Sequence, residues 1–334
     1  MESHDFRPGA SFESLRVRAR ILAQTRNFFA ARGVLEVETP LLCEAGAVDQ
    51  HLDPILARYH PPGSQRPLDR WLVTSSEHSM KRLLAAGSGP IYQISRAFRD
   101  GERGRLHNPE FTILEWYRPG WDHHQLMDEV EALVGEILRS APGGPRIPEG
   151  RFDRWTYRQA FLDALGFDPH KVSASDLCRI AGLEGVPPLP GLEAEDRDAW
   201  LNLLLLARVE GTLGFDRPAF LLDYPPSQAA LARVRLDDVP VAERFELYVY
   251  GVEIANGYHE LCDPKEQEAR FHEANRKRRE MGKAQLPMDL RFLAALEAGL
   301  PPCAGVAVGL DRVAMLALGS STIDDVIAFP IDRA

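Results

Sequence analysis

Apolar residues near the start of the chain recur at the spacing of an α-helix. Leu15, Ile21, Leu22 and Phe28 lie close to one face of such a helix, and Gly33 would end it. The pattern therefore predicts a first helix that runs to about residue 32.

Runs of β-forming residues and breakers alternate after this helix. They predict strands at 34–37, 71–74, 91–98 and 111–118, and a helix at 77–86. The last two strands flank a polar loop at 100–109 that contains glycine. This arrangement is typical of a long antiparallel hairpin.

The second half of the chain starts with a breaker-rich stretch at 141–150, APGGPRIPEG. From there to about residue 226 the pattern is mostly helical, and we interpret 151–215 as a helical insertion. Strands are predicted at 219–223, within 245–261 and at 305–309, and a last helix at 311–318. Helices and antiparallel strands alternate unevenly, which favours an α+β fold, an antiparallel sheet flanked by helices, over a parallel doubly wound one.

Composition places the chain among soluble globular proteins. Its 334 residues are 45% hydrophobic and 26% charged, and no apolar run approaches the roughly 20 residues that span a bilayer. The opening residues lack a signal-peptide pattern, so we expect a cytoplasmic protein without a membrane partner. The four cysteines are far apart and form no CxxC, which suggests neither a zinc site nor a disulfide framework.

The charge balance disfavours nucleic acid as a general partner. The formal net charge is -10, whereas phosphate backbones attract clustered Lys and Arg. The mixed-charge run at 264–282 could form a nucleic-acid face, but alternating signs are more typical of a solvated helix.

Familiar catalytic motifs are missing from the sequence. It contains no GxxxxGK[ST], and no GxGxxG follows a predicted strand; HExxH and GxSxG are also absent. Three local signals remain.

The first signal is the predicted hairpin. Its loop, FRDGERGRLHNPEF, concentrates Arg99, Arg103, Arg105, His107 and Asn108, and guanidinium forks suit phosphate oxygens. On the returning strand, alternation places four side chains on one face: Phe111, Ile113, Glu115 and Tyr117. This face could bind a ligand or be an ordinary polar sheet surface.

The second signal is RFELYVYGVEIANGYHEL. A turn at 248–251 would pair Leu247 with Val252 and set Glu246 opposite Glu253. Two facing carboxylates repel unless a cation lies between them, and such hard oxygens suit Mg²⁺; a surface pair screened by Lys or Arg is the alternative. Further along this strand three residues share one face, Asn256, Tyr258 and Glu260, and would suit an ammonium ligand.

The third signal is GVAVGLDR at 305–312. Its glycines would let the backbone approach a ligand, and Arg312 could reach a phosphate from the start of the next helix. A glycine-lined strand packed on a helix, with Arg312 in a surface ion pair, explains the same pattern.

In this order along one chain, the three signals resemble the motifs of class II aminoacyl-tRNA synthetases, and of the lysine subgroup in particular. VLEVETPLL, with Pro40, resembles motif 1, which forms a dimer interface in that family; the hairpin resembles motif 2 and GVAVGLDRVAML motif 3. The resemblance covers most of the chain. It implies an ATP-dependent ligase with Mg²⁺, a single catalytic domain over 1–334 and a homodimer.

Motif 1 begins after only about 33 residues, which leaves no room for the anticodon-binding OB-fold of lysyl-tRNA synthetases. In this the chain is similar to stand-alone ligases that attach (R)-β-lysine to a lysine side chain of translation elongation factor P. The expected partners are thus elongation factor P and (R)-β-lysine or lysine, in preference to tRNA.

The resemblance also implies roles for individual residues. Arg99 and Arg312 would carry the catalytic charge stabilisation, and Glu246 and Glu253 would hold the metal. The implied ATP site comprises Arg99, Asp100, Gly101, Glu102, His107, Asn108, Phe111, Glu246, Leu247, Gly309 and Arg312. The implied diamino acid pocket comprises Ser75, Ser76, Glu77, Glu115, Tyr117, Glu253, Asn256, Tyr258 and Glu260.

Two positions depart from the family pattern. Gly101 stands where motif 2 has a glutamate, so Asp100 or Glu102 would have to substitute, and Ser76 replaces a proline. Three other functions therefore stay open: a ligase that charges tRNA, an asparagine synthetase-like enzyme, and an inactive binding module. Glu115 and Glu260 speak against the second, because carboxylates repel an acidic substrate.

Overall fold

The computed structural model describes residues 6–141, 143–189 and 191–334, so Pro142 of the predicted linker lies outside them. The chain divides into two compact units. Unit 1 comprises the chain up to Trp121 together with Ala132–Arg146 and Leu261–Ala334, and unit 2 comprises Asp122–Glu131 and Ile147–Glu260.

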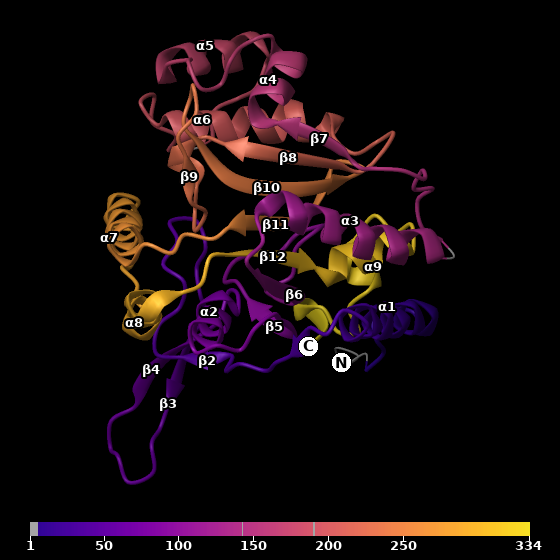
Figure 1. Ribbon diagram of the computed structural model, residues 1–334, viewed down its shortest axis with the longest axis vertical. Coiled ribbons are helices and arrows are strands. Elements are labelled where there is room, and N and C mark those ends of the chain that lie inside the picture. The colour runs from indigo at the N-terminus through magenta and orange to yellow at the C-terminus, as the bar shows by residue number, and fades with distance from the viewer. Residues whose placement is uncertain (1–5, 142, 190) are drawn as a thin grey trace, which may run out of the picture. The chain divides into compact units, whose positions relative to one another are not determined.

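Unit 1 is built on a four-stranded run of sheet, β1-β5-β6-β12, and a small sheet, β2-β4-β3 (Figure 1). Only β1 and β5 are parallel; the other pairs are antiparallel. The strands are β1 (Leu35–Glu36), β2 (Leu42–Cys43), β3 (Leu56–Tyr59), β4 (Leu68–Leu72), β5 (Ile91–Phe98), β6 (Glu110–Pro119) and β12 (Cys303–Gly309). The helices are α1 (Phe12–Ala30), α2 (Glu77–Ala85), α7 (Pro264–Glu280), α8 (Leu290–Gly299) and α9 (Leu310–Ala317), with 3₁₀ turns at Ile323–Asp325 and Ile331–Arg333.

Helix α1 covers one face of this sheet. Ser11 caps its first turn, and the ring of Phe29 stacks on Tyr92 at 4.4 Å and meets Trp116 edge-on at 5.2 Å. Tyr92 and Trp116 are cross-strand partners, so the even-numbered residues of β5 and β6 face α1. Because side chains alternate along a strand, the odd-numbered residues face the other side.

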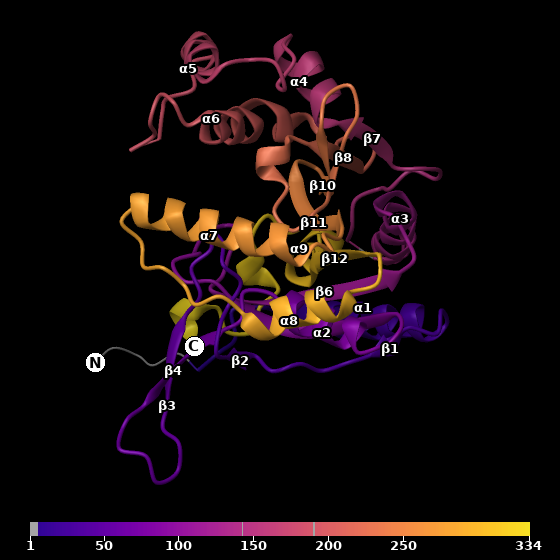
Figure 2. The same cartoon turned by 60° about the vertical axis from the view of Figure 1, so that its left-hand side comes forward.

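Helices α7 and α8 lie side by side in unit 1 (Figure 2). Arg278 of α7 is 3% exposed and donates to the carbonyls of Asp49 and Leu52 and to the Asp53 carboxylate. The exposed face of α7 carries mixed-charge pairs such as Arg276 with Glu273. The run at 264–282 is therefore a largely solvated helix, as predicted, and Arg278 on its buried side anchors it to the loop at 49–53.

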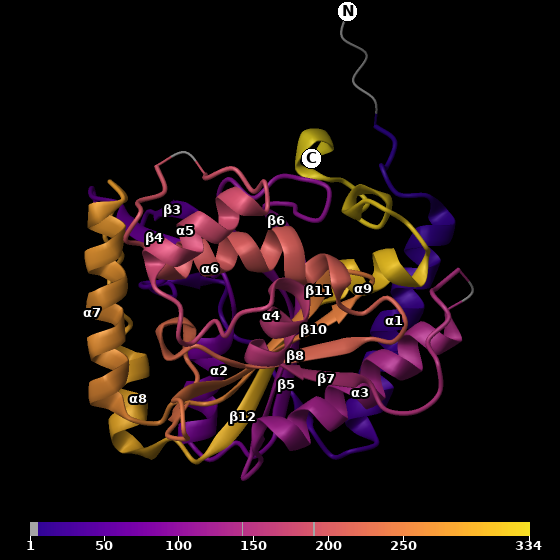
Figure 3. The same ribbon diagram turned by 90° about the horizontal axis from the view of Figure 1, so that it is seen from above.

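Unit 2 holds a sheet in the order β11-β10-β8-β7, with β9 also on β10 (Figure 3). Its strands are β7 (Asp153–Thr156), β8 (Ala219–Tyr224), β9 (Val234–Arg235), β10 (Val241–Val249) and β11 (Val252–His259). Its helices are α4 (Tyr157–Leu165), α5 (Ala174–Leu183) and α6 (Arg197–Leu204), continued by a π-helical turn (Leu205–Val209) and a 3₁₀ turn (Glu210–Thr212), with another 3₁₀ turn at Pro226–Gln228. Helix α3 (His123–Ser140) starts in unit 2 and ends in unit 1.

The core of unit 2 packs these helices on the sheet. Tyr157 and Phe161 of α4 are fully buried, and the Tyr157 ring lies 4.9 Å from that of Tyr224 on β8. Residues 151–215 are therefore mostly helical, as predicted, although they also contribute the edge strand β7. No described helix is long and apolar enough to cross a membrane.

Gly257 of β11 is required by close packing. A Cβ built there would lie 2.4 Å from Cζ of the fully buried Phe245. We expect Gly257→Ala to lower the free energy of unfolding by about 1–3 kcal/mol, the usual cost of overpacking, as measured by urea denaturation. Gly211→Ala is the matched control, because nothing lies within 4 Å of that position; an equal loss in both variants would contradict the packing argument.

Candidate functional site

The odd-numbered face of the unit 1 sheet is polar and lacks bulky side chains on one strand. Ladder partners place Ile113, Glu115 and Tyr117 of β6 beside three small residues of β12, and Gln93 of β5 opposite Glu115. The three small residues are Gly305, Ala307 and Gly309. A carboxylate and a phenol thus border a strip of backbone that a ligand could approach.

Glu115 is the buried charge of this face. It is 1% exposed, and its carboxylate accepts hydrogen bonds from the Ser75 hydroxyl and, at 2.7 Å, from the backbone N–H of Ser76. Burial raises the pKa of Glu115 to about 7, while the two serine bonds oppose the shift. The site therefore holds a carboxyl group that a cation would readily ionise.

The neighbouring residues of α2 form a second ionic contact. The Glu77 carboxylate is 2.5 Å from Nζ of Lys81, a lysine with no exposed surface. The Gln93 amide donates to the Ser76 hydroxyl at 2.9 Å. Ser75, Ser76, Glu77 and Glu115 thus lie together, with Lys81 as an unpredicted neighbour, while their contact with an amino acid stays a prediction.

Two arginines converge near His107. Arg312 lies 2.8 Å from His107 Nε2 and donates to the carbonyl of Leu106 at 3.3 Å. Burial lowers the pKa of His107, and the charges of Arg312 and Arg99 lower it further. Motifs from two distant parts of the chain therefore build one electropositive cluster in unit 1.

Arg99 lies over an aromatic ring in the same cluster. Its guanidinium carbon is 5.0 Å from the centre of the Phe111 ring, and Nη1 is 3.7 Å from the Glu102 carboxylate. Asp100 and Gly101 form the turn between Arg99 and Glu102, and Gly101 has φ +74°. Glycine suits this left-handed position, and Glu102 supplies an acid one residue beyond the family's usual place.

Asn108 makes structural contacts. It is 3% exposed, donates to the carbonyl of Glu110 at 2.6 Å and accepts from the backbone N–H of Ile331 at 3.0 Å. The amide nitrogen thus holds the loop to the start of β6, and the amide oxygen holds it to the C-terminal segment. A nucleotide contact by Asn108 stays a prediction.

Sequence reasoning missed Asp311 and Arg18. Asp311 is 1% exposed, pairs with Arg18, and accepts from the backbone N–H of Thr112 at 2.6 Å. Arg18 also donates to the Thr112 hydroxyl at 2.6 Å. This network fixes the start of α9, and with it Arg312, against the hairpin. The sequence signal for Asp311 was its position next to Arg312 in the run LDR.

In unit 2 the predicted register of the β10–β11 hairpin is wrong. The turn is Tyr250–Gly251, which pairs Val249 with Val252 and sets Glu253 opposite Tyr248. A bulge follows between Leu247 and Tyr248, so Glu246 lies opposite Asn256 and the two acids are not cross-strand partners. The Tyr248 hydroxyl donates to Glu246 at 2.6 Å.

A cation already lies beside Glu246. The Arg244 guanidinium is 2.5 Å from Oε1 of Glu246 and stacks 4.4 Å from the centre of the Tyr224 ring. Despite burial, the Glu246 charge holds the pKa of Arg244 above its usual range. Arg244 was missed because the motif was interpreted for its acids alone.

The other predicted residues of unit 2 follow the same strands. Leu247 has no exposed surface, so its side chain belongs to the core, and Glu260 is 2% exposed. Asn256 lies 3.5 Å from the Glu246 carboxylate. Glu246, Asn256 and Arg244 therefore form one polar group, while ligand contacts of Glu253, Tyr258 and Glu260 stay predictions.

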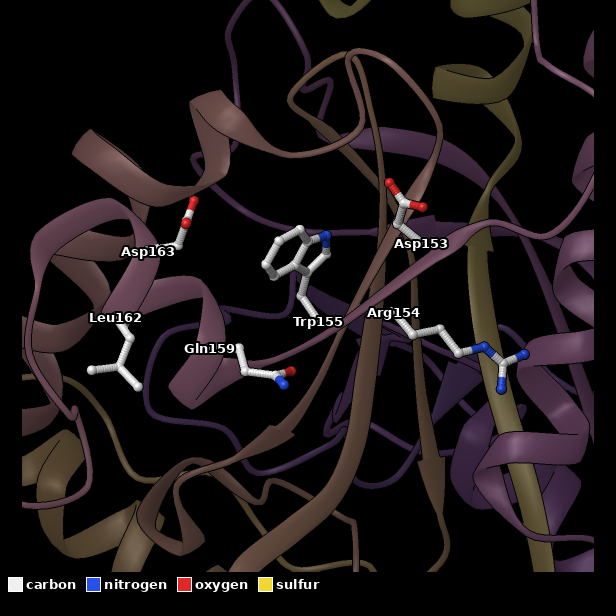
Figure 4. Close-up of a pocket in the computed structure, with 6 residues that line it drawn as sticks. All are labelled: Asp153, Arg154, Trp155, Gln159, Leu162 and Asp163. Carbon is white, nitrogen blue, oxygen red and sulfur yellow. The ribbon is translucent and has the colours of Figure 1, made fainter.

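Unit 2 also has a hollow on its surface (Figure 4). It is lined by Asp153, Arg154, Trp155, Gln159, Leu162 and Asp163 of β7 and α4. None of them was a predicted site residue.

Comparison with known proteins shows the family of the chain. The family profile described as tRNA synthetases class II (D, K and N) matches residues 3–333. The chain belongs to this family of class II synthetases.

Several relatives of the chain that match over its full length share one name. The chain is 50% identical to the "Elongation factor P--(R)-beta-lysine ligase" of Vibrio cholerae over 100% of both chains. Proteins of the same name from Proteus mirabilis and Salmonella typhi are 48% and 47% identical, each over 100% of this chain and 99% of theirs.

Proposed function

We propose that this protein activates (R)-β-lysine, or lysine, as its adenylate and transfers it to a lysine side chain of translation elongation factor P. The observation that carries the proposal is the full-length similarity to ligases of that name, at 47–50% identity. The polar sheet face and the arginine cluster of unit 1 provide the chemistry that such a reaction needs.

The first step needs stabilisation of phosphate charge. A carboxylate oxygen of the amino acid attacks the α-phosphorus of ATP, a P–O bond forms, and pyrophosphate leaves. We assign Arg99 to the α-phosphate, Arg312 to the γ-phosphate end and Phe111 to adenine stacking. Guanidinium groups held by Glu102, Leu106 and His107 are preorganised for this charge.

The amino acid is recognised by its ammonium groups. Glu115, buried and hydrogen-bonded to Ser75 and Ser76, is the group that we assign to one of them, with Tyr117 beside it. An anionic pocket also disfavours an acidic substrate. This argues against the asparagine synthetase-like alternative.

ATP would be accompanied by Mg²⁺, which supplies further charge neutralisation. Glu246 and Glu253 offer the hard carboxylate oxygens that this ion prefers. Binding there requires Glu246 to share its oxygens with Arg244 and Tyr248, which now occupy them.

In the second step the acceptor amine attacks the carbonyl carbon of the adenylate. A C–N bond forms, AMP leaves, and the amine loses a proton.

We further propose a cytoplasmic homodimer formed through the motif 1 region near Pro40. The motif 1 strands β1 and β2 expose Leu35 and Leu42, and β3 and β4, in the same small sheet as β2, expose Leu56, Tyr59 and Leu68. Exposed large apolar side chains are typical of an interface.

Pyrophosphate exchange with α-lysine, (R)-β-lysine and aspartate tests the first step. We expect exchange with one or both lysines and none with aspartate. Exchange with no amino acid would instead favour an inactive binding module. The second step is tested by mass spectrometry of elongation factor P after incubation with the enzyme, ATP and the active amino acid; stable charging of tRNA in its place would overturn the proposed acceptor.

A further inference from the structure

The start of helix α3 and the adjacent ends of two strands bring three metal-ligating side chains together within unit 2. They are His123 of α3, Glu243 of β10 and His259 of β11. One candidate ligand atom of each lies within 4.8 Å of the others. None of the three belongs to the predicted ATP or amino acid site.

His123 is buried without hydrogen-bond partners. Its exposed fraction is 2%, and within the described chain neither Nδ1 nor Nε2 makes a hydrogen bond. Burial lowers the pKa of His123 to about 3, so the ring is neutral. A neutral imidazole offers one donor and one acceptor, and leaving both unpaired inside a protein is unfavourable.

The other two groups lie against each other. His259 Nδ1 and Glu243 Oε2 lie 2.8 Å apart, yet among the described residues neither atom has an aligned hydrogen bond. His123 is the buried member of this cluster without a partner, and an ion between the three side chains would supply one. Two imidazoles and one carboxylate are a frequent donor set for zinc.

The spacing requires only a small adjustment. Zinc bonds to imidazole nitrogen and carboxylate oxygen are about 2.0–2.2 Å, so ligand atoms around the ion lie roughly 3.4 Å apart. His259 and Glu243 are already closer than this. Closing a 4.8 Å separation to this spacing requires a movement of about 1.4 Å, which would complete three ligands and leave a fourth position for water.

Two arginines at the rim oppose a cation. Arg233 Nε is 3.0 Å from Glu243 Oε2, and Arg235 Nη1 is 3.5 Å from Oε1. Arg235 is also paired with Asp223 at 3.2 Å, and its side chain is 34% exposed. Because both arginines reach solvent, they can turn away when an ion enters, but their charge weakens its binding.

We propose that His123, Glu243 and His259 form a binding site for a divalent transition metal, with Zn²⁺ as the matching ion. The metal would fasten the first turn of α3 to the β10–β11 pair. Its role is structural, because none of its ligands belongs to the residues that we assign to ATP or to the amino acid.

The test uses untagged full-length protein, stripped with a chelator and then dialysed against Zn²⁺ or Co²⁺ without ATP. We expect about one equivalent of metal per chain, a Co²⁺ absorption band of tetrahedral type, and a rise in Tm with Zn²⁺. His123→Gln and His259→Gln should lose the band and the rise in Tm. They should keep pyrophosphate exchange, which shows that they fold.

Two further variants sharpen the result. His124→Gln removes the exposed neighbouring imidazole and should bind metal like the wild type. Arg235→Gln removes a cation beside Glu243 and should tighten binding several-fold. The proposal is overturned if the wild-type protein retains no metal, which would leave water as the partner of His123, or if both histidine variants bind as the wild type does.

Discussion

Replacing Arg312 with alanine is expected to lower kcat/KM for pyrophosphate exchange by about 10²–10³-fold, the usual effect of removing one preorganised group that stabilises transition-state charge. Arg312 is held in place by Leu106 and His107, so its guanidinium is oriented before ATP binds. Arg312→Lys keeps the charge but not the planar fork and should recover only part of the activity.

The matched control is Arg105→Ala. Arg105 lies in the β5–β6 loop, next to Leu106 and His107, and donates to the carbonyl of Ser321. Its replacement tests whether the loss of any positive charge in this region slows the reaction. We expect near wild-type exchange. Equal losses in both variants, or an unchanged rate in Arg312→Ala, would contradict the assignment of Arg312 to the triphosphate.

Much of the fold could be predicted from local pattern. The hairpin β5–β6 and the helices α1, α2 and α9 lie where periodicity, Gly33 and Gly87 indicated. The alternation along β6 correctly placed Phe111, Ile113, Glu115 and Tyr117 on one face, because a regular strand has a fixed period of two. The α+β class followed from the same patterns.

The β10–β11 hairpin shows where local pattern fails. A four-residue turn at 248–251 would have set Glu246 opposite Glu253. The observed turn is the shorter Tyr250–Gly251, which pairs Tyr248 with Glu253, and the bulge after Leu247 then sets Glu246 opposite Asn256. A bulge depends on the packing of both strands and leaves little trace in one sequence. The residue opposite Glu246 could not be deduced from alternation alone.

Partners from distant parts of the chain were also beyond sequence reasoning. Arg18 and Asp311 are separated by 293 positions, yet they form one ion pair. Lys81 shares a helix with Glu77 at the favourable spacing of four residues and could have been found. Its complete burial was not evident, because lysine is rarely buried.

Glu115→Gln is expected to stabilise the ligand-free protein above neutral pH while weakening its substrate binding. In the fold the pKa of Glu115 is about 7, against a usual 4.5. Folding therefore favours the protonated acid, and this stability, complete below pH 4.5, is lost as pH rises through 7. At pH 8 the penalty is at most about 3 kcal/mol. The glutamine can still accept from Ser76 and avoids the charge, so urea denaturation should show a gain at pH 8 and none near pH 4.5.

Substrate binding should change in the opposite direction. The ammonium group needs ionised Glu115, so KM for the lysine substrate should rise about tenfold per pH unit below 7 and level off above it. In Glu115→Gln, KM should be about 30-fold or more higher at pH 8 and independent of pH. Glu110→Gln, an exposed acid on the same strand, is the control and should keep the wild-type profile. Replacing a residue that merely supported the fold would lower stability and activity together. A gain in stability with a loss of substrate binding would therefore mark Glu115 as a ligand-binding group. A wild-type KM that does not vary with pH would exclude that role.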